Sequence, residues 1–242
     1  MTMYYFWRMV DRVINESDIL LEVIDARMPN LTRNKKVENK VRRKRKFLII
    51  VMFKSKELVF VSCKDRMGIS TLKEMIFKLA KKRRHWNYTK VGVIGYPNTG
   101  KSSVINVLVG RSSAKTSPIP GLTRGIQWIR GECDIIFSDT PGVIPLDEKD
   151  ETEQALMSVI DPNKLVNSDL AAMRIIQLFL DYNKSSLEKF YDVKIETDDM
   201  FEIILKIGKR KNFLRKGGKV DEVRTALTII RDWQRGNLLL NF

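Results

Sequence analysis

The stretch KVGVIGYPNTGKSS, residues Lys90–Ser103, decides the fold of this chain. An apolar run over 91–94 leads into the pattern G-x-x-x-x-G-K-S, which begins at Gly95, and an amphipathic segment follows to about Val109. A strand, a glycine-bounded loop and a helix N-terminus in this order are typical of a P-loop, which surrounds a phosphate with backbone N–H groups. A chance match is the alternative, and the strand before and helix after argue against it.

The P-loop pattern predicts a role for each residue of the phosphate site. Lys101 would reach the β- and γ-phosphates of a nucleotide and act in catalysis, and the hydroxyl of Ser102 would hold Mg²⁺. The remaining expected nucleotide contacts are Tyr96, Pro97, Asn98, Thr99, Gly100 and Ser103.

Composition points to a polyanionic partner. The 242-residue chain has a formal net charge of +15 and a pI of about 9.8, which favours nucleic acid as the partner. The N-terminal residues have no signal-peptide pattern, and the longest apolar run, 47–53, is too short to span a bilayer. We therefore expect no membrane association and a cytoplasmic location.

Histidine and cysteine give no sign of metal or nucleophilic chemistry. Cys63 and Cys133 each lie in an apolar, strand-like run, so we expect both to be buried small hydrophobes rather than metal ligands or a disulfide pair. The single histidine, His85, stands beside four basic residues and is expected on the surface.

Alternating strand and helix patterns predict an α/β fold with a parallel sheet. Expected strands are 19–24, 47–51, 58–61, 91–94, 126–130 and 134–138, the last two paired across a turn at 131–132. After residue 150 only helical patterns remain, over about 151–159, 164–181, 185–191, 198–207 and 219–235. We expect a nucleotide-binding domain over 1–150 and an all-helical domain over 151–242.

Three further motifs make joint sense in a GTPase. DTPG follows a strand, so Asp139 would hold Mg²⁺ through water and the amide of Gly142 would contact the γ-phosphate. Thr123, between the P-loop and DTPG, lies where a switch threonine completes the Mg²⁺ shell and contributes to catalysis. Ser62-Cys63-Lys64 ends a predicted strand and resembles the S-A-K element that supports a guanine base.

The order of these motifs is permuted, because S-C-K precedes the P-loop instead of following DTPG. The combination of DARMP, S-C-K, GYPNTGKSS, PIPGLTR and DTPG is similar to the YlqF/RbgA and YawG group of circularly permuted ribosome-assembly GTPases. The stretch 213–238 also resembles the RNA-binding C-terminal segment of that group.

This resemblance implies a GTP-hydrolysing switch that acts in large ribosomal subunit assembly, binds rRNA, and is a monomer when off the ribosome. Val143 and Ile144 stand where Ras-like enzymes carry a water-orienting glutamine, so the resemblance implies slow intrinsic hydrolysis with assistance from the ribosome. Asn98 matches a P-loop asparagine that binds K⁺ in potassium-activated relatives. A purely structural role for Asn98 is an equal alternative.

The guanine-reading motif N-K-x-D does not occur in the sequence. In addition, only residues 52–57 separate the predicted strands 47–51 and 58–61, whereas a parallel crossover needs roughly a dozen or more. Either the two strands form an antiparallel hairpin, or a segment of about twenty residues is absent here. We favour the absent segment, together with a chain break between about Val51 and Lys56 and a parallel pairing of the strands.

Basic clusters at 42–46, 81–84 and 209–219 are candidate RNA contacts, although each could be a solvated helix face. The third has six cations, no acid and an inserted Phe213-Leu214, which favours RNA. Two other functions remain open: a nucleotide-gated RNA-binding module with little turnover, and a P-loop ATPase outside translation.

Overall fold

The computed structural model describes residues 3–44, 46–51, 58–82, 88–110, 126–140 and 150–240. It divides the chain into two compact units, Met1–Glu148 and Lys149–Phe242. Each unit has its own hydrophobic core.

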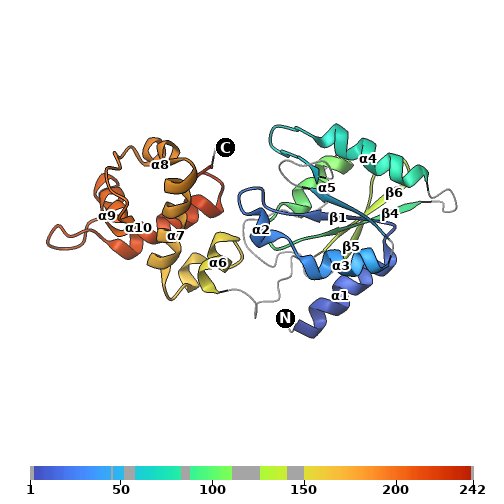
Figure 1. Cartoon of the computed structure of the whole chain (residues 1–242), viewed down its shortest axis with the longest axis horizontal. Coiled ribbons are helices and arrows are strands. Elements are labelled where there is room, and N and C mark those ends of the chain that lie inside the picture. Colours follow the sequence, from blue (N-terminus) through green and yellow to red (C-terminus); the bar gives the residue numbers. More distant parts are fainter. Residues whose placement is uncertain are drawn as a thin grey trace. The chain divides into compact units, whose positions relative to one another are not determined.

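The first unit contains a six-stranded sheet in the order β3-β2-β1-β4-β6-β5 (Figure 1). The strands are β1 (Ile19–Val23), β2 (Phe47–Val51), β3 (Leu58–Val59), β4 (Thr89–Ile94), β5 (Gln127–Arg130) and β6 (Ile135–Asp139). All neighbours pair in parallel except β5 and β6, which are antiparallel. The predicted α/β class is confirmed, and the P-loop strand β4 is a central strand of the sheet.

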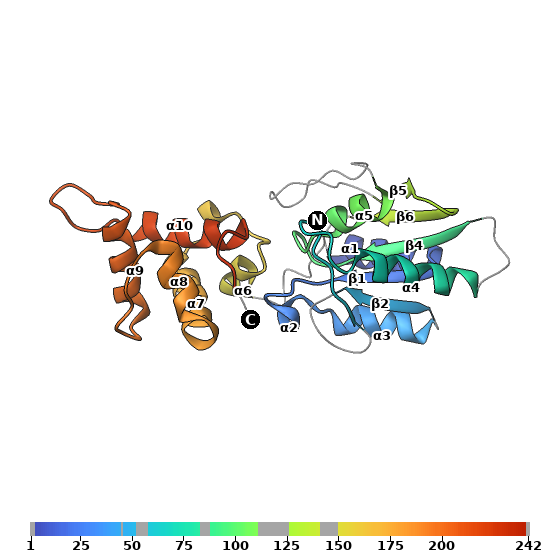
Figure 2. The ribbon, with the colours of Figure 1, turned by 90° about the horizontal axis from the view of Figure 1, so that it is seen from above.

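Helices cover both faces of this sheet, as Figures 1 and 2 show. One face packs against α1 (Met3–Glu16) and α3 (Lys35–Arg43), and the other against α4 (Ile69–Lys81) and α5 (Lys101–Val109). The strand side chains alternate accordingly, since Leu20 packs with α1 and α3 whereas Ile19 and Leu21 pack with α4 and α5. This two-sided burial explains why the strands appear as nearly continuous apolar runs.

A close approach between α1 and β4 requires a glycine in the P-loop strand. A Cβ on Gly92 would lie 2.3 Å from the hydroxyl oxygen of Ser17 and 2.8 Å from Cγ1 of Val13. The missing side chain therefore lets the end of α1 pack directly on the strand.

The strands on either side of residues 52–57 are parallel. Ile50 pairs with Leu58 and Val51 with Val59, which confirms the parallel pairing and makes the antiparallel hairpin wrong. The expected chain break between Val51 and Lys56 concerns residues that lie outside the described part of the chain.

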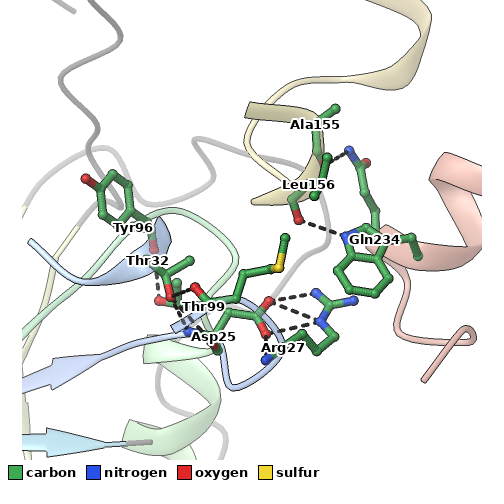
Figure 3. Close-up of polar contacts among 10 residues, drawn as sticks. Asp25, Arg27, Thr32, Tyr96, Thr99, Ala155, Leu156 and Gln234 are labelled. Atoms are coloured by element: carbon green, nitrogen blue, oxygen red, sulfur yellow. Dashed lines mark hydrogen bonds and ion pairs between the residues drawn. The ribbon is translucent and has the colours of Figure 1, made fainter. Parts of the chain in front are cut away.

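The second unit is helical, as the sequence predicts. Its helices are α6 (Glu151–Leu156), η2 (Pro162–Lys164), α7 (Ser168–Tyr182), α8 (Lys184–Tyr191), α9 (Met200–Arg210) and α10 (Glu222–Gln234). Trp233 is fully buried at its centre, with its indole N–H donating to the carbonyl of Leu156 at 2.8 Å and its ring meeting Phe179 edge-on. The amide of Gln234 donates to the carbonyls of Ala155 and Ile160, each at 3.1 Å, and the first of these contacts is drawn in Figure 3.

The two cysteines are more exposed than the sequence predicts. Cys133 is exposed, because it lies in the β5–β6 turn with φ of 53°, so its predicted burial in a strand is wrong. Cys63 is only half-buried, although it packs against the apolar core, and burial raises the pKa of its thiol. His85 lies outside the described residues. The short helix α2 (Pro29–Thr32) was not predicted.

Among the helices that the structure describes, none combines the length and the apolar character that a membrane span requires.

Candidate nucleotide-binding site

The P-loop has the predicted local structure. Strand β4 ends at Ile94, and α5 begins at Lys101 directly after Gly100, whose φ of 91° lies in the left-handed region. Gly95 has φ of 150°, and a Cβ at this position would lie 2.3 Å from the carbonyl oxygen of Val23. Only glycine fits there, because the loop passes over the end of strand β1.

Lys101 is held inside the loop with 5% of its surface exposed. Its Nζ donates to the carbonyl of Tyr96 at 2.6 Å. The hydroxyl of Thr99 donates to the same carbonyl at 2.9 Å, and Figure 3 draws this second contact. Burial lowers the pKa of Lys101 from 10.5 to about 8, and the negative charge of Asp139 acts in the opposite direction. A nucleotide phosphate fits here, since it would supply the counter-charge that a buried ammonium requires.

Ser102 and Asp139 meet at the neighbouring position. The Ser102 hydroxyl donates to both carboxylate oxygens of Asp139, at 3.0 and 3.2 Å. Asp139 ends β6 and is 1% exposed, so the sheet and the helix fix both groups. Hydroxyl and carboxylate oxygens are the ligands that Mg²⁺ prefers, and these two residues therefore fit the predicted metal role.

The sheet also anchors the start of the DTPG segment. The Thr140 hydroxyl donates to the carbonyl of Val93 at 2.6 Å, while the Val93 N–H donates to the hydroxyl of Ser138 at 3.2 Å. These bonds tie the end of β6 to the P-loop strand, so Asp139 keeps a fixed position relative to Ser102.

The structure describes some, but not all, of the other residues predicted to contact the nucleotide. Pro97 is buried and Ser103 is half-buried in the first turn of α5. Asn98 has φ of 58°, a left-handed conformation that asparagine tolerates better than most residues. Thr123 and Gly142 lie outside the described residues.

Ser62-Cys63-Lys64 follows β3 at the edge of the sheet that carries the P-loop, because parallel strands share their carboxyl edge. The Ser62 hydroxyl donates to the carboxylate of Asp65 at 2.7 Å and accepts from its N–H at 3.2 Å, which fixes a tight turn. Strands β2 and β1 separate this turn from β4. The S-C-K turn and the P-loop are thus separated along the sheet edge, as expected if the turn contacts the base of a nucleotide and the P-loop its phosphates.

Two features of this edge were not assigned a role from the sequence. In the DARMP motif, Asp25 forms a two-pronged ion pair with Arg27 that includes a 2.7 Å contact, and the Asp25 N–H donates to the hydroxyl of Thr32 at 3.0 Å (Figure 3). The motif thus closes its own loop after β1. The second feature is Glu22, a buried carboxylate inside β1, which the lone acid in the run ILLEV could have signalled.

Comparisons with known proteins agree with this geometry. The family model described as 50S ribosome-binding GTPase matches residues 90–210. A GTP-binding protein of Methanocaldococcus jannaschii is 39% identical, with 96% of this chain and 65% of that protein covered. Nuclear/nucleolar GTPase 2 of Arabidopsis thaliana is 32% identical over 96% of this chain and 43% of that protein. The chain thus spans less than two thirds of these relatives.

The alignment with the Methanocaldococcus protein extends over 247 positions, more than the 242 residues of this chain. That relative therefore has residues without counterparts here, and an absent segment after Val51 stays a prediction.

The fold has a solved counterpart. The GDP-bound structure of TM YlqF superposes with a TM-score of 0.51 at 18% identity and covers 94% of each chain, which supports the fold alone. The strand order around β4, with S-C-K before the P-loop and DTPG after it, is that of the circularly permuted motif arrangement. Together with the family match over 90–210, these observations lead to one conclusion: the chain belongs to the 50S ribosome-binding GTPase family.

Proposed function

We propose that this protein is a GTP-hydrolysing switch that acts in assembly of the large ribosomal subunit by binding its rRNA. The observation that carries the proposal is the buried amine of Lys101 inside the P-loop, beside the paired Ser102 and Asp139. Lys101 pairs with the β- and γ-phosphates of GTP, and Ser102 and Asp139 hold Mg²⁺, with Thr123 and Gly142 completing the site. Bound Mg²⁺ would neutralise charge on the transferred phosphoryl group.

Slow intrinsic turnover, with stimulation by the ribosome and by K⁺ at Asn98, is part of the proposal. So are a monomeric state away from the ribosome and a cytoplasmic location. The description of the matched family, 50S ribosome-binding GTPase, supports the ribosomal part of the proposal. The Arabidopsis relative is named a nuclear/nucleolar GTPase, and that name does not support the cytoplasmic part.

The second unit offers the surface for RNA. Between α9 and α10, residues 213–221 form a small hairpin in which Leu214 pairs with Val220. The N–H of Arg215 donates to the carbonyl of Lys219 at 2.8 Å, and Gly217 and Gly218 make the turn with φ of 91° and 76°. We call residues 209–219, which comprise the end of α9 and most of this hairpin, the basic hairpin.

Contacts within the protein separate the six cations of the basic hairpin into two groups. Arg210 pairs with Asp192, Arg215 pairs with Asp221 at 3.1 Å, and Lys211 lies 5.6 Å from the ring centroid of Tyr191. The other three are exposed and have no ion pair within the described part of the chain: Lys209, Lys216 and Lys219. These three lysines are the ones that remain available to phosphates.

The base of the hairpin is fixed, so the lysines have a defined presentation. A Cβ on Gly208 would lie 2.3 Å from Cγ1 of Val220, which shows how closely α9 packs against the hairpin. The guanidinium of Arg224 lies 4.2 Å from the centroid of the Phe213 ring. Leu214 remains 44% exposed beside the free lysines, which suits contact with both the backbone and a base of RNA.

The central experiment measures nucleotide hydrolysis with and without large ribosomal subunits, in K⁺ and in Na⁺. We expect slow GTP turnover that both subunits and K⁺ accelerate. Lys101→Ala should abolish tight GTP binding, while Lys78→Ala, which removes an exposed lysine of α4, should leave it unchanged. GTP affinity that survives Lys101→Ala would contradict the site assignment.

The same experiment separates the alternatives. Tight GTP binding with no acceleration by subunits would favour a nucleotide-gated RNA-binding module. Equal affinity for ATP and GTP would favour an ATPase, because the guanine-reading motif does not occur in the sequence.

A further inference from the structure

A cavity of about 30 Å³ lies behind the P-loop, between the sheet and the helices α1 and α3. Its walls are mainly aliphatic, from Met9, Val10 and Val13 of α1 together with Val37 and Ile94. Gly95 and Tyr96 of the P-loop and Thr140 after β6 also line it.

One charged side chain lines this cavity. Glu22 is 2% exposed, and its Oε1 accepts from the N–H of Asn34 at 2.9 Å. Its Oε2 is buried and accepts no hydrogen bond from the described part of the chain, although a protonated Glu22 can donate to the carboxyl of Glu38. A buried acceptor without a donor costs about 1–3 kcal/mol, and more when it is charged, so this oxygen calls for a ligand.

The charge state of Glu22 depends on few groups. Burial, opposed by the hydrogen bond from the Asn34 N–H, raises its pKa to about 7; the charge and hydrogen bond of Glu38 on α3 contribute to the rise, and Arg33, which pairs with Glu38, opposes it. Helix α1 and strand β4 contribute only apolar side chains to the cavity wall. At pH 8 the carboxyl is therefore an anion with one unsatisfied oxygen.

We propose that this cavity binds a small primary ammonium cation, of the size of ammonium or methylammonium, which donates a hydrogen bond to Oε2 of Glu22. Such a cation supplies both the missing donor and the compensating charge, and its methyl group fits the aliphatic walls. A water-sized group needs about 10–15 Å³, so the volume suits roughly two non-hydrogen atoms. Ca²⁺ and Mg²⁺ take several oxygen ligands, and the described residues contain no cluster of three acids, histidines or cysteines.

The position of the cavity gives this cation an effect on the P-loop. Tyr96 borders the cavity, and its carbonyl accepts the hydrogen bond from Lys101. Neutralising Glu22 reduces the negative charge next to an anion-binding loop, so the affinity for a nucleotide should rise when the cation is bound. Only this second effect rests on the proposed nucleotide binding.

Thermal unfolding of the full chain at pH 8 tests the site directly. Methylammonium chloride should raise the midpoint by about 3–5 °C at ten times its dissociation constant, relative to tetramethylammonium chloride at equal ionic strength. Glu22→Gln keeps the acceptor for Asn34 and replaces the free oxygen by a donor, so the difference between the two salts should disappear. At pH 5.5, where Glu22 is protonated, the difference should also disappear in the unsubstituted chain.

A second variant keeps Glu22 and removes the space. Val37→Leu adds a methylene at the cavity wall. At least three times as much methylammonium should then be needed for the same rise in the unfolding midpoint. Equal responses to both salts, or a response that survives Glu22→Gln or pH 5.5, would overturn the proposal. If methylammonium stabilises the chain without raising GDP affinity, the site stands and its link to the P-loop is wrong.

Discussion

Binding of GDP at pH 8 should draw a proton from solution onto Lys101. Burial lowers the pKa of this amine to about 8, so about half of the molecules carry a neutral lysine at that pH. Nucleotide phosphates beside the amine favour its charged form and raise its pKa. Binding should therefore take up about half a proton per nucleotide at pH 8 and almost none at pH 6.5.

The depressed pKa also corresponds to an energy. A fall from 10.5 to about 8 means that burying the charged amine costs about 3 kcal/mol at pH 7. The folded state holds fewer protons than the unfolded state between these values, so this cost disappears as the pH rises from 8 to 10.5. Compared with Lys101→Met, the unsubstituted chain should thus gain about 3 kcal/mol of stability over that range.

Calorimetric titration with GDP at pH 8, in two buffers with different ionisation enthalpies, measures the proton uptake. Lys101→Arg is the matched control, because a guanidinium stays protonated and should take up none where it binds. If the observed binding enthalpy is the same in both buffers, Lys101 is already fully charged in the free protein and the reasoning from its burial fails.

Three further predictions concern stability and RNA. The free energy of unfolding of the unsubstituted chain should fall by about 3 kcal/mol between pH 4.5 and pH 7, because the folded state keeps the Glu22 proton to a higher pH than the unfolded state. Glu22→Gln should remove this fall, which urea unfolding measures. Changing the three unpaired lysines of the basic hairpin to alanine should lower the slope of log K against log salt for duplex rRNA by about 2–3. The same change at the exposed Lys164, Lys189 and Lys194 is the control, and an equal loss there would remove the hairpin from the interface. Gly95→Ala should cost about 1–3 kcal/mol and weaken GDP binding, and unaltered affinity would contradict the close packing.

Sequence reasoning recovered the sheet because its strands are buried on both faces. The run Phe47–Val51 has no polar side to make it ambiguous, and both its ends agree with the structure. The other predicted strands differ from the observed ones by one or two residues at an end. Strand β6 is shifted by one residue from the predicted 134–138, since the turn before it uses left-handed residues at Cys133 and Asp134 that no apolar pattern encodes.

The site was recoverable only where a short motif carries it. Ser102 and Asp139 lie within hydrogen-bond distance because the P-loop and DTPG fix them to neighbouring strands, and their roles toward a nucleotide and Mg²⁺ stay predictions. The lone acid in ILLEV could have pointed to Glu22 as a buried carboxylate, but the cavity beside it depends on how α1 and α3 pack on the sheet, which the sequence does not show. The division of the basic hairpin into paired and unpaired cations depends likewise on Asp192 and Tyr191, which no spacing rule connects to it.

The strand order has a consequence for synthesis of the chain. Strand β1 lies between β2, which is made soon after it, and β4, whose residue Lys90 pairs with Asp18 from 72 positions away. As the chain emerges, β1, β2 and β3 can pair first, which leaves one edge of β1 open although all its residues are buried in the finished sheet. An open apolar edge invites pairing with other chains. The permuted order thus creates an interval in translation, ending when β4 emerges, during which this protein is most exposed to aggregation.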